Sequence, residues 1–385
     1  MIYLDYAATT PTSDEALHVY NKVSQSFYGN PSSLHDIGSK AQHLLQSCRR
    51  ELSSLLNGSE NGIYFTSGGS EANILALKSL INAHQGKGNH LITTAAEHSS
   101  VFNFFQLMME EGFEVTFLPI HEDGLIQIKD LKHAIKKSTI LVSIHHGNGE
   151  IGAVQPIEEI GDLLEAYDIL FHSDCVQTFG KIPINIQKAK LDSLSISSHK
   201  IYGPKGVGSA YINPNTTWQQ EIPGTTHESG FRPGTENLPG IAAFITIAAA
   251  VCNHMEIEQK RLNKLKLYLV NELRKRSTFI HIESGWSTDY LPHILGLRIK
   301  GMEGQYTMLE CNRYGVAVST GTACQIANLA PSRTMLALGR SETEAKEFIR
   351  LSLGKQSTME DMQKTISIFD TIIEKSLLVR RETKH

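Results

Sequence analysis

A chain of 385 residues is longer than one hydrophobic core normally supports, so we expect two domains. Its 36 basic and 40 acidic side chains give a formal net charge of −4, which argues against a dedicated nucleic-acid or membrane-surface protein. The five cysteines are an odd number without paired metal-ligand spacing, and the first residues carry no signal-peptide pattern. We therefore expect reduced thiols, no metal site and a cytoplasmic location.

Short apolar runs alternate with longer segments of helical periodicity along the first 250 residues or so. Runs that are apolar on both faces and separated by helices predict a mostly parallel sheet of seven strands, covered on both sides. The fold class is therefore α/β. The predicted strands are 62–65, 90–93, 114–118, 140–144, 169–172, 193–197 and 207–212, and the predicted helices between them include 70–84, 99–111, 129–136 and 157–166.

The pattern changes after residue 253. The apolar run 241–252 contains Thr246 and is too short to span a bilayer, so we expect a buried helix there. A long charged helix, 254–276, and a mixed α/β region follow it. We predict a large domain of residues 14–253 and a smaller α/β domain of residues 1–13 and 254–385.

Polar residues follow several of the predicted strands, at the edge where parallel sheets bind ligands. They are residues 67–70, His98, Asn148, Asp174 and residues 197–200. The turn Thr66-Ser-Gly-Gly-Ser70 also opens a predicted helix, and the N-terminal end of a helix offers unpaired N–H groups to a phosphate. Taken alone, such a turn is more often a plain strand–helix connection.

One lysine and one aspartate at this edge fit a particular cofactor. Lys200 stands in Ser195-Ile-Ser-Ser-His-Lys200-Ile-Tyr-Gly-Pro-Lys-Gly206, and Asp174 ends the apolar run 169–174. A pyridoxal-phosphate enzyme needs a lysine that binds the cofactor covalently and an acidic residue that pairs with its ring nitrogen. A surface lysine is the commoner explanation for Lys200 on its own.

The motifs together carry a resemblance over nearly the whole chain. They are Tyr3-Leu-Asp-Tyr-Ala-Ala-Thr-Thr-Pro11, Phe65-Thr-Ser-Gly-Gly-Ser-Glu71, Glu97-His98, Glu150-Ile-Gly152, His172-Ser-Asp174-Cys-Val-Gln177, His199-Lys-Ile-Tyr-Gly-Pro-Lys-Gly206, Arg232-Pro-Gly-Thr235 and Ser319-Thr-Gly-Thr-Ala-Cys324. The chain resembles the cysteine desulfurases of the NifS/IscS type, which are class-V aminotransferase-like, fold type I pyridoxal-phosphate enzymes. The resemblance implies that the protein removes sulfur from L-cysteine, leaving L-alanine and a persulfide on Cys324.

The resemblance also implies roles for the residues that match the family motifs. Lys200 binds the cofactor and moves a proton, Asp174 pairs with the pyridine nitrogen, and His98 stacks on the ring and contributes to catalysis. The other residues expected to bind the cofactor are Gly69, Ser70, Asn148, Gln177, Ser197, His199 and Thr235. Thr235 matches a threonine that reaches the phosphate of the neighbouring subunit, so a homodimer is implied.

Cys324 and Arg350 match the family's residues for sulfur transfer and substrate binding. A thiolate at Cys324 is expected to attack the substrate sulfur, although an ordinary thiol with a pKa of about 8.5 is only partly ionised near neutrality. Arg350, in Phe348-Ile-Arg-Leu-Ser-Leu-Gly354, is expected to hold the substrate carboxylate with its guanidinium fork. The remaining cysteines, Cys48, Cys175, Cys252 and Cys311, match no catalytic motif, and we interpret them as structural.

The chain departs from the family pattern at one position. Many relatives have two asparagines before Glu-Ile-Gly, whereas this chain has Asn148 followed by Gly149. Either Asn148 takes over the contact with cofactor and substrate, or Gln177 and water do. The pair His145-His146 lacks a suitably spaced third metal ligand, so we expect structural roles for both.

Two other hypotheses remain open at this stage. A selenocysteine lyase or a small-molecule aminotransferase would share Lys200, Asp174 and the phosphate turn, but an aminotransferase has no need of Cys324. A catalytically silent scaffold would bind acceptors without the chemistry. For the desulfurase, the expected partners are L-cysteine and a sulfur-acceptor protein, with an iron–sulfur scaffold, a thiolation protein and an apo-enzyme as the alternatives. Neither nucleic acid nor a membrane is an expected partner.

Overall fold

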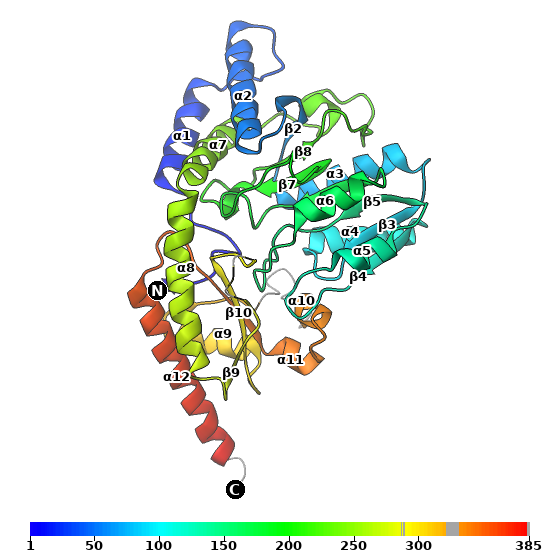
Figure 1. Cartoon of the computed structure of the whole chain (residues 1–385). Helices are drawn as coiled ribbons and strands as arrows, with labels where there is room; N and C mark the ends of the chain where they lie inside the picture. Colours follow the sequence, from blue (N-terminus) through cyan, green and yellow to red (C-terminus); the bar gives the residue numbers. More distant parts are fainter. Residues whose placement is uncertain (286, 288, 321–330, 383–385) are drawn as a thin grey trace.

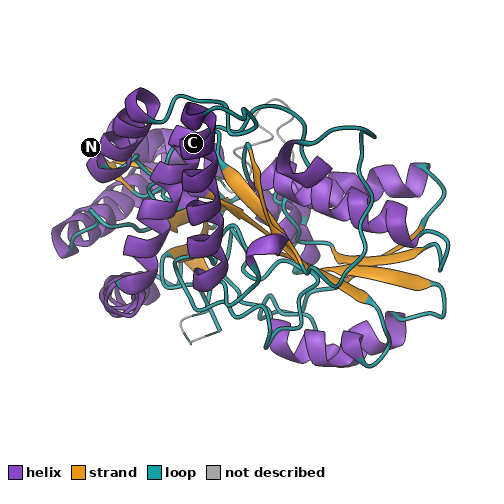
Figure 2. Ribbon diagram, turned by 90° about the horizontal axis from the view of Figure 1, so that it is seen from above, coloured by secondary structure: helices purple, strands orange, loops and turns teal. Residues whose placement is uncertain are grey.

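The computed structural model describes residues 1–385 except 286, 288, 321–330 and 383–385. Cys324 therefore lies outside the described residues. Viewed from above, the strands of the larger part of the molecule lie between helices on both sides, as Figure 2 shows. This is the layered α/β architecture that the alternation of apolar runs and helical segments predicts.

The central sheet has seven strands in the order β2-β8-β7-β6-β5-β3-β4. Only β8 runs antiparallel to its neighbours, so the prediction of a mostly parallel seven-stranded sheet is confirmed. The strands are β2 (Ile63–Thr66), β3 (His90–Thr94), β4 (Glu114–Leu118), β5 (Thr139–Ser143), β6 (Leu170–Asp174), β7 (Ser193–Ser197) and β8 (Gly208–Ile212).

Side chains that alternate along the strands feed two apolar clusters, one on each face of the sheet. Tyr64 and Leu91 pack with helices α3 and α4, whereas their neighbours Phe65 and Ile92 pack with α2, α6 and α7. Each face is thus buried under helices, which explains why the strands are apolar throughout. The helices of this part are α1 (Asp14–Ser26), α2 (Asp36–Leu55), α3 (Gly69–His84), α4 (Ser99–Glu110), α5 (Ile128–Ala134), α6 (Ile157–Glu165) and α7 (Leu238–Asn253), with 3-10 turns at Glu60–Gly62, Ser198–Lys200 and His227–Gly230.

A further apolar cluster joins Leu4 to residues between Leu262 and Ile373. It packs around an antiparallel sheet of order β12-β10-β9 and a parallel pair in which β1 lies beside β11. The N-terminal strand therefore belongs with the last third of the chain (Figure 1). The elements are β1 (Ile2–Tyr3), α8 (Met255–Arg274), β9 (Ile280–Ile282), β10 (Ile294–Ile299), α9 (Gly304–Arg313), β11 (Val316–Ala317), α10 (Arg333–Ala337), α11 (Glu342–Lys346), β12 (Phe348–Ser352) and α12 (Met359–Glu382).

Helices α7 and α8 meet at His254 with a bend of 70°. The run 241–252 was expected to form a buried helix, and most of the residues from Leu238 to Ala248 in α7 are indeed buried. Within the described ranges, no single helix is long and apolar enough to cross a membrane, although the bent pair α7–α8 reaches that threshold when taken together. The domain boundary at residues 253 and 254 stays a prediction, which the position of this bend supports.

Candidate active site

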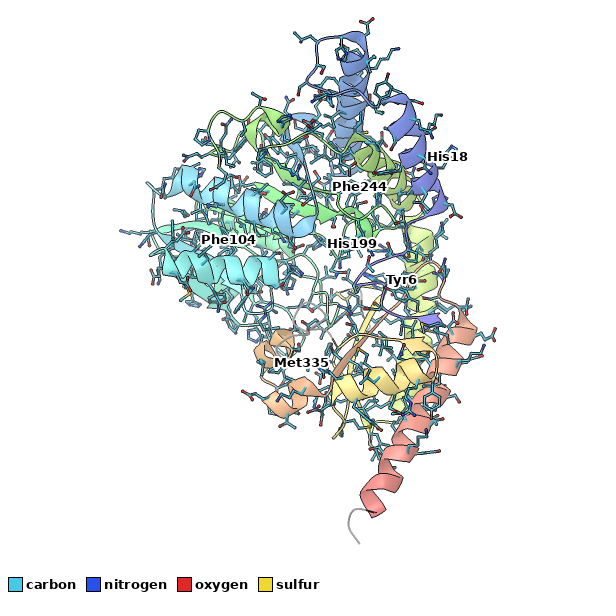
Figure 3. All side chains as sticks on the ribbon, turned by 180° about the vertical axis from the view of Figure 1, so that it is seen from behind. Tyr6, His18, Phe104, His199, Phe244 and Met335 are labelled. Carbon is cyan, nitrogen blue, oxygen red and sulfur yellow. The ribbon has the colours of Figure 1, made fainter. Side chains whose placement is uncertain are left out.

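Residues that follow the carboxyl ends of β6 and β7 contact a segment from the start of the chain, residues 7–10. The backbone N–H and hydroxyl of Thr10 both donate to the carbonyl oxygen of His199, each over 2.9 Å. Figure 3 shows His199 between the sheet and the part of the chain that carries Tyr6. The edge that the sequence predicts as a ligand site is thus closed on one side by the N-terminal segment.

Lys200 ends a short 3-10 turn directly after β7. Its Nζ donates to the carbonyl oxygens of Ala7, at 2.6 Å, and Ala8, at 2.8 Å. The neighbouring His199 ring contacts the Thr9 hydroxyl at 3.1 Å, and burial, with the nearby charge of Lys200, lowers the pKa of His199 to about 4. His199 is therefore neutral near pH 7 and can donate a hydrogen bond.

Asp174, at the end of β6, is held by two donors. The Val176 N–H reaches Oδ1 at 2.9 Å, and the Asn73 side-chain amide reaches Oδ2 at 2.8 Å. The same amide donates to the Ser100 hydroxyl at 3.0 Å, and the Asn73 oxygen lies 3.2 Å from Nε2 of His172. Asn73 is a site residue that the sequence analysis missed, because nothing in its local pattern distinguishes it from other polar residues of α3.

His98 precedes α4 and caps that helix. Its Nδ1 accepts from the Ser100 backbone N–H at 3.2 Å and lies 2.8 Å from the Ser100 hydroxyl, so Asn73 connects it to Asp174 through Ser100. The ring presents part of its surface to open space while protein surrounds the rest. This burial lowers the pKa of His98. The nearby negative charge of Asp174 raises this pKa in part, whereas the positive charge of Lys200 lowers it further. Asp174 and Lys200 are therefore both close enough to His98 to act on it electrostatically.

A buried pair, Glu97 and His145, lies beside His98 in the chain. One carboxylate oxygen of Glu97 accepts from the Thr94 hydroxyl, the His145 N–H and the His145 ring, each at 2.9 Å. Burial alone would lower the pKa of His145, but Glu97 outweighs it and the net pKa is raised. His146 contacts Thr178 instead, at 3.0 Å. In the part of the chain that the structure describes, no group of three or more potential metal ligands forms.

The turn before α3 is held by the side chain of Glu71. The Glu71 carboxylate accepts from the Ser67 backbone N–H and, at 2.8 Å, from Nε of Arg232. A Cβ added to Gly69 would lie 2.5 Å from Val176, whereas one added to Gly68 would meet no atom within 4 Å. Ser70 is exposed at the N-terminal end of the helix, where the first N–H groups lack intrahelical partners.

Two other residues of the predicted phosphate site differ in exposure. The Ser197 hydroxyl is buried and has no hydrogen-bond partner within the described ranges. Thr235 is exposed in the loop before α7, and no hydrogen bond of this chain joins it to Ser70, Ser197 or His199 among the described residues.

Arg350 lies on β12 and is 5% exposed. Its Nη1 donates to the carbonyl oxygen of Gly149 at 2.8 Å, and its Nη2 donates to Oδ1 of Asp5 at 2.8 Å. Its backbone pairs with Ser319, the N–H of Arg350 donating to the Ser319 oxygen at 2.6 Å. Ser319, which begins the sequence motif that ends at Cys324, is thus paired with Arg350. Beyond that motif in the sequence, the Ser332 hydroxyl donates to the buried carboxylate of Glu150.

The positions around Gly149 bear on the departure from the family pattern. A Cβ on Gly149 would lie 3.2 Å from the side-chain nitrogen of Gln177, which donates to the Ala7 oxygen at 3.1 Å. The Asn148 oxygen accepts from the N–H groups of Glu150 and Ile151, at 2.9 and 3.0 Å. Its amide nitrogen donates to Ala96 and Thr334, at 3.3 Å each. Gln177 therefore fills the space beside Gly149, and the Asn148 side chain is engaged in holding the turn.

The four described cysteines are poor candidates for a nucleophile. Burial raises the pKa of Cys48, Cys175 and Cys311 to about 12 and that of Cys252 to about 11. Each is therefore a neutral thiol near pH 7. This fits the structural interpretation of these residues, including Cys175 next to Asp174.

Comparison with known proteins identifies the family. Residues 2–365 match the family described as Aminotransferase class-V. The chain belongs to this family. A relative from Bacillus subtilis named "Putative cysteine desulfurase NifS" is 47% identical over 375 residues, which are 97% of this chain and 95% of the relative.

Two solved structures support the same conclusion. A structure titled "NIFS-LIKE PROTEIN" has a TM-score of 0.90 and 29% identity, and the match covers 97% of this chain and 99% of that one. A second, titled "SspA in complex with cysteine", has a TM-score of 0.80 and 30% identity, covering 92% of this chain and 99% of that one. The α/β fold of this class-V aminotransferase is thus shared over nearly its full length.

Proposed function

We propose that this member of the Aminotransferase class-V family is a cysteine desulfurase, which uses pyridoxal phosphate to remove sulfur from L-cysteine. The observation that carries the proposal is the convergence of Lys200, Asp174 and His98 at one sheet edge, in a chain 47% identical to a protein named as a cysteine desulfurase. Names of relatives support this activity over transamination, and the SspA structure was obtained with cysteine.

The residues present fit the cofactor. The orphaned Ser197 hydroxyl, the open space at Gly68 and the N-terminal end of α3 suit a phosphate, with His199 and Ser70 as further donors. Asp174, fixed by Asn73, suits a protonated ring nitrogen, and we assign the Gln177 amide, beside Gly149, to a ring oxygen. Lys200 is held on the carbonyls of Ala7 and Ala8, ready to bind the cofactor covalently. When bound, the cofactor supplies an electron sink for the bonding electrons released at the substrate.

The protein's own groups then have separate tasks. Arg350 binds the substrate carboxylate, and Lys200 moves the proton at the substrate Cα. The thiolate of Cys324 attacks the substrate sulfur, so that a sulfur–sulfur bond forms while the carbon–sulfur bond breaks. Protonation of the former sulfur-bearing carbon leaves L-alanine, and Cys324 carries the sulfur as a persulfide for a protein acceptor.

We further propose a homodimer in which Thr235 contributes to the neighbouring subunit's phosphate site. Its exposure, together with its separation from Ser70, Ser197 and His199 within one chain, supports a contact made in trans. A sedimentation measurement at micromolar concentration tests this: a monomer with full cofactor occupancy would contradict the proposal.

The decisive experiment is incubation of the purified protein with L-cysteine while sulfide and alanine are measured together. We expect equal amounts of both in the presence of a thiol reductant, and borohydride should fix the cofactor on Lys200. Lys200→Ala should lose the covalent cofactor and nearly all turnover. Pyruvate formation without sulfide would favour an aminotransferase instead, and a fully active Lys200→Ala protein would refute the assignment.

A further inference from the structure

Arg350 is held from one side only. Its Nη1 has the Gly149 oxygen at 2.8 Å and its Nη2 has the Asp5 carboxylate at 2.8 Å. Its Nε is buried and has no partner among the described residues. Leaving a buried donor without an acceptor costs about 1–3 kcal/mol, so this nitrogen indicates a place that a ligand completes.

The pattern of bonds shows which edge of the guanidinium is open. A guanidinium binds a carboxylate through two parallel N–H groups, along either the Nε–Nη2 edge or the Nη1–Nη2 edge. A carboxylate on the Nε–Nη2 edge would bring its second oxygen to Nε. Asp5 reaches Nη2 alone and the Gly149 oxygen reaches Nη1 alone, so neither partner occupies Nε. The Nε–Nη2 edge therefore keeps its Nε donor for another acceptor.

We propose that Asp5 is a positioning residue for substrate recognition, which orients Arg350 so that its Nε–Nη2 edge receives the substrate carboxylate. This rests on the proposed role of Arg350 in binding L-cysteine. Asp5 itself contacts the arginine and none of the reacting groups.

The location of Asp5 suits this role. It forms an isolated parallel bridge with Ser352, two residues after Arg350 on the same strand, so the backbone fixes the spacing of the ion pair. Two residues further along, Ala7 and Ala8 hold Lys200. One short segment, residues 5–8, thus contacts both Lys200, which acts near the amino group of the substrate, and Arg350, which is assigned to its carboxylate.

The surroundings also accommodate a second carboxylate next to Asp5. Burial lowers the pKa of His293 well below its usual value, and positive charges nearby lower it further. The cations that act on His293 are Lys181, Lys266, Arg350 and Lys200. Arg350 and Lys200 both act on this one buried histidine, so a substrate carboxylate at Arg350 also meets the charge of Lys200.

Two amines that differ only in a carboxylate test the proposal. L-alanine and ethylamine share the amino group and the two-carbon chain, and neither carries sulfur to transfer. We expect Asp5→Ala in the cofactor-loaded enzyme to weaken L-alanine binding about tenfold by calorimetry and to leave ethylamine unchanged, because only the carboxylate contact is misplaced. Asp5→Asn keeps an acceptor oxygen for Nη2 and should lose less. With L-cysteine, KM should rise more than kcat falls.

Three further variants serve as controls. Asp370→Ala removes another aspartate–arginine pair of the same region, with Arg276, and should change neither ligand's affinity. Arg350→Ala should weaken L-alanine binding at least as much as Asp5→Ala, and the double variant should be no weaker than Arg350→Ala alone. Asp5→Ala should lower the unfolding temperature, because it leaves the buried Arg350 cation without its carboxylate partner, and Asp5→Asn should lower it less. Unchanged cofactor absorbance and unchanged ethylamine binding in Asp5→Ala then show that the site itself is intact.

The possible results separate this inference from the proposed function. Tighter L-alanine binding in Asp5→Ala would mean that Asp5 competes with the substrate, and an equal loss for both amines would mean a general structural role. Either result would overturn the inference. If Arg350→Ala matters and Asp5→Ala does not, only the role of Asp5 fails. If Arg350→Ala leaves L-alanine binding unchanged, the carboxylate site itself is wrongly assigned.

Discussion

Asn73 is the side chain on which the geometry beneath the proposed cofactor ring depends. It is 1% exposed and makes three hydrogen bonds, to Asp174 at 2.8 Å, to Ser100 at 3.0 Å and to His172 at 3.2 Å. A hydrogen bond to a charged group contributes about 1.5–3 kcal/mol and a neutral one about 1 kcal/mol. Water can enter the open side of the site and replace part of this. We therefore expect Asn73→Ala to lower the free energy of unfolding by about 2–4 kcal/mol.

The prediction separates into a structural part and a cofactor part. Urea unfolding of the cofactor-free protein gives the first part, and the same measurement after reconstitution with pyridoxal phosphate adds the second. Because a ligand that binds the native state stabilises it according to its affinity, we expect a larger loss with cofactor than without. Asn73→Leu fills nearly the same space without hydrogen bonds, so it distinguishes lost hydrogen bonds from a cavity.

Asn185 provides a matched control. Its side chain accepts from the Lys188 N–H at 3.1 Å, in the loop between β6 and β7, and has no assigned role in the site. Asn185→Ala should cost about 1 kcal/mol, the usual contribution of one neutral hydrogen bond, with or without cofactor. An Asn73→Ala variant that behaves in the same way, with an equal and small loss in both states, would refute the idea that Asn73 supports Asp174.

Three other outcomes follow from the structure and the proposed chemistry. Cys324→Ser should retain the cofactor absorbance and its change on adding L-cysteine, but mass spectrometry should find no added sulfur; sulfur on Cys175 or Cys311 instead would disprove the proposed transfer. Burial lowers the pKa of His146 to about 3, below the value of about 6.5 in the unfolded chain. The unfolded state therefore binds more protons between these two pH values, and the free energy of unfolding should fall as the pH decreases from about 6.5 toward 3. His146→Gln should reduce the proton uptake on unfolding at pH 5 by about one, and an unchanged slope would contradict this. Glu228 accepts from both Nη groups of Arg49 and from the Phe65 N–H, all at 2.7 Å. Because Glu228→Ala leaves a largely buried cation unpaired, it should lower the free energy of unfolding in urea by about 3–5 kcal/mol. A loss within 0.5 kcal/mol or so would show that the stability of the protein does not depend on the pair.

The sequence was sufficient for the sheet because each strand is an apolar run of about five residues with a clear end. Residues such as Asp174 and Lys200 follow those ends, and parallel strands bring such positions to one edge without any knowledge of contacts. Helices α1 and α2, between residues 14 and 55, were not among the predicted elements.

Contacts between residues far apart in the sequence could not be predicted from local patterns. Asn73 and Asp174 are 101 residues apart, and Asp5 and Arg350 are 345 residues apart, so no local pattern pairs them. The alternative at Gly149 was left open for the same reason: its outcome depends on where Gln177 packs. The structure puts Gln177 against Gly149 and turns the Asn148 side chain toward the backbone of its own turn. The roles of the other predicted site residues stay predictions.

The pairing of the N-terminal segment with the last third of the chain has a consequence for biosynthesis. Leu4 donates to Ala317 and accepts from Ser352, and Ala7 donates to the Ser352 hydroxyl. The residues that emerge first from the ribosome thus bind partners that are synthesised more than 300 positions later, and only then can they hold Lys200 and Arg350 in position. Contacts of such sequence separation form late in folding, because the entropy of closing the intervening loop must be overcome first. We expect nascent chains that end before β12 to hold a folded central sheet without cofactor, so that the capacity to bind pyridoxal phosphate appears only when synthesis is nearly complete.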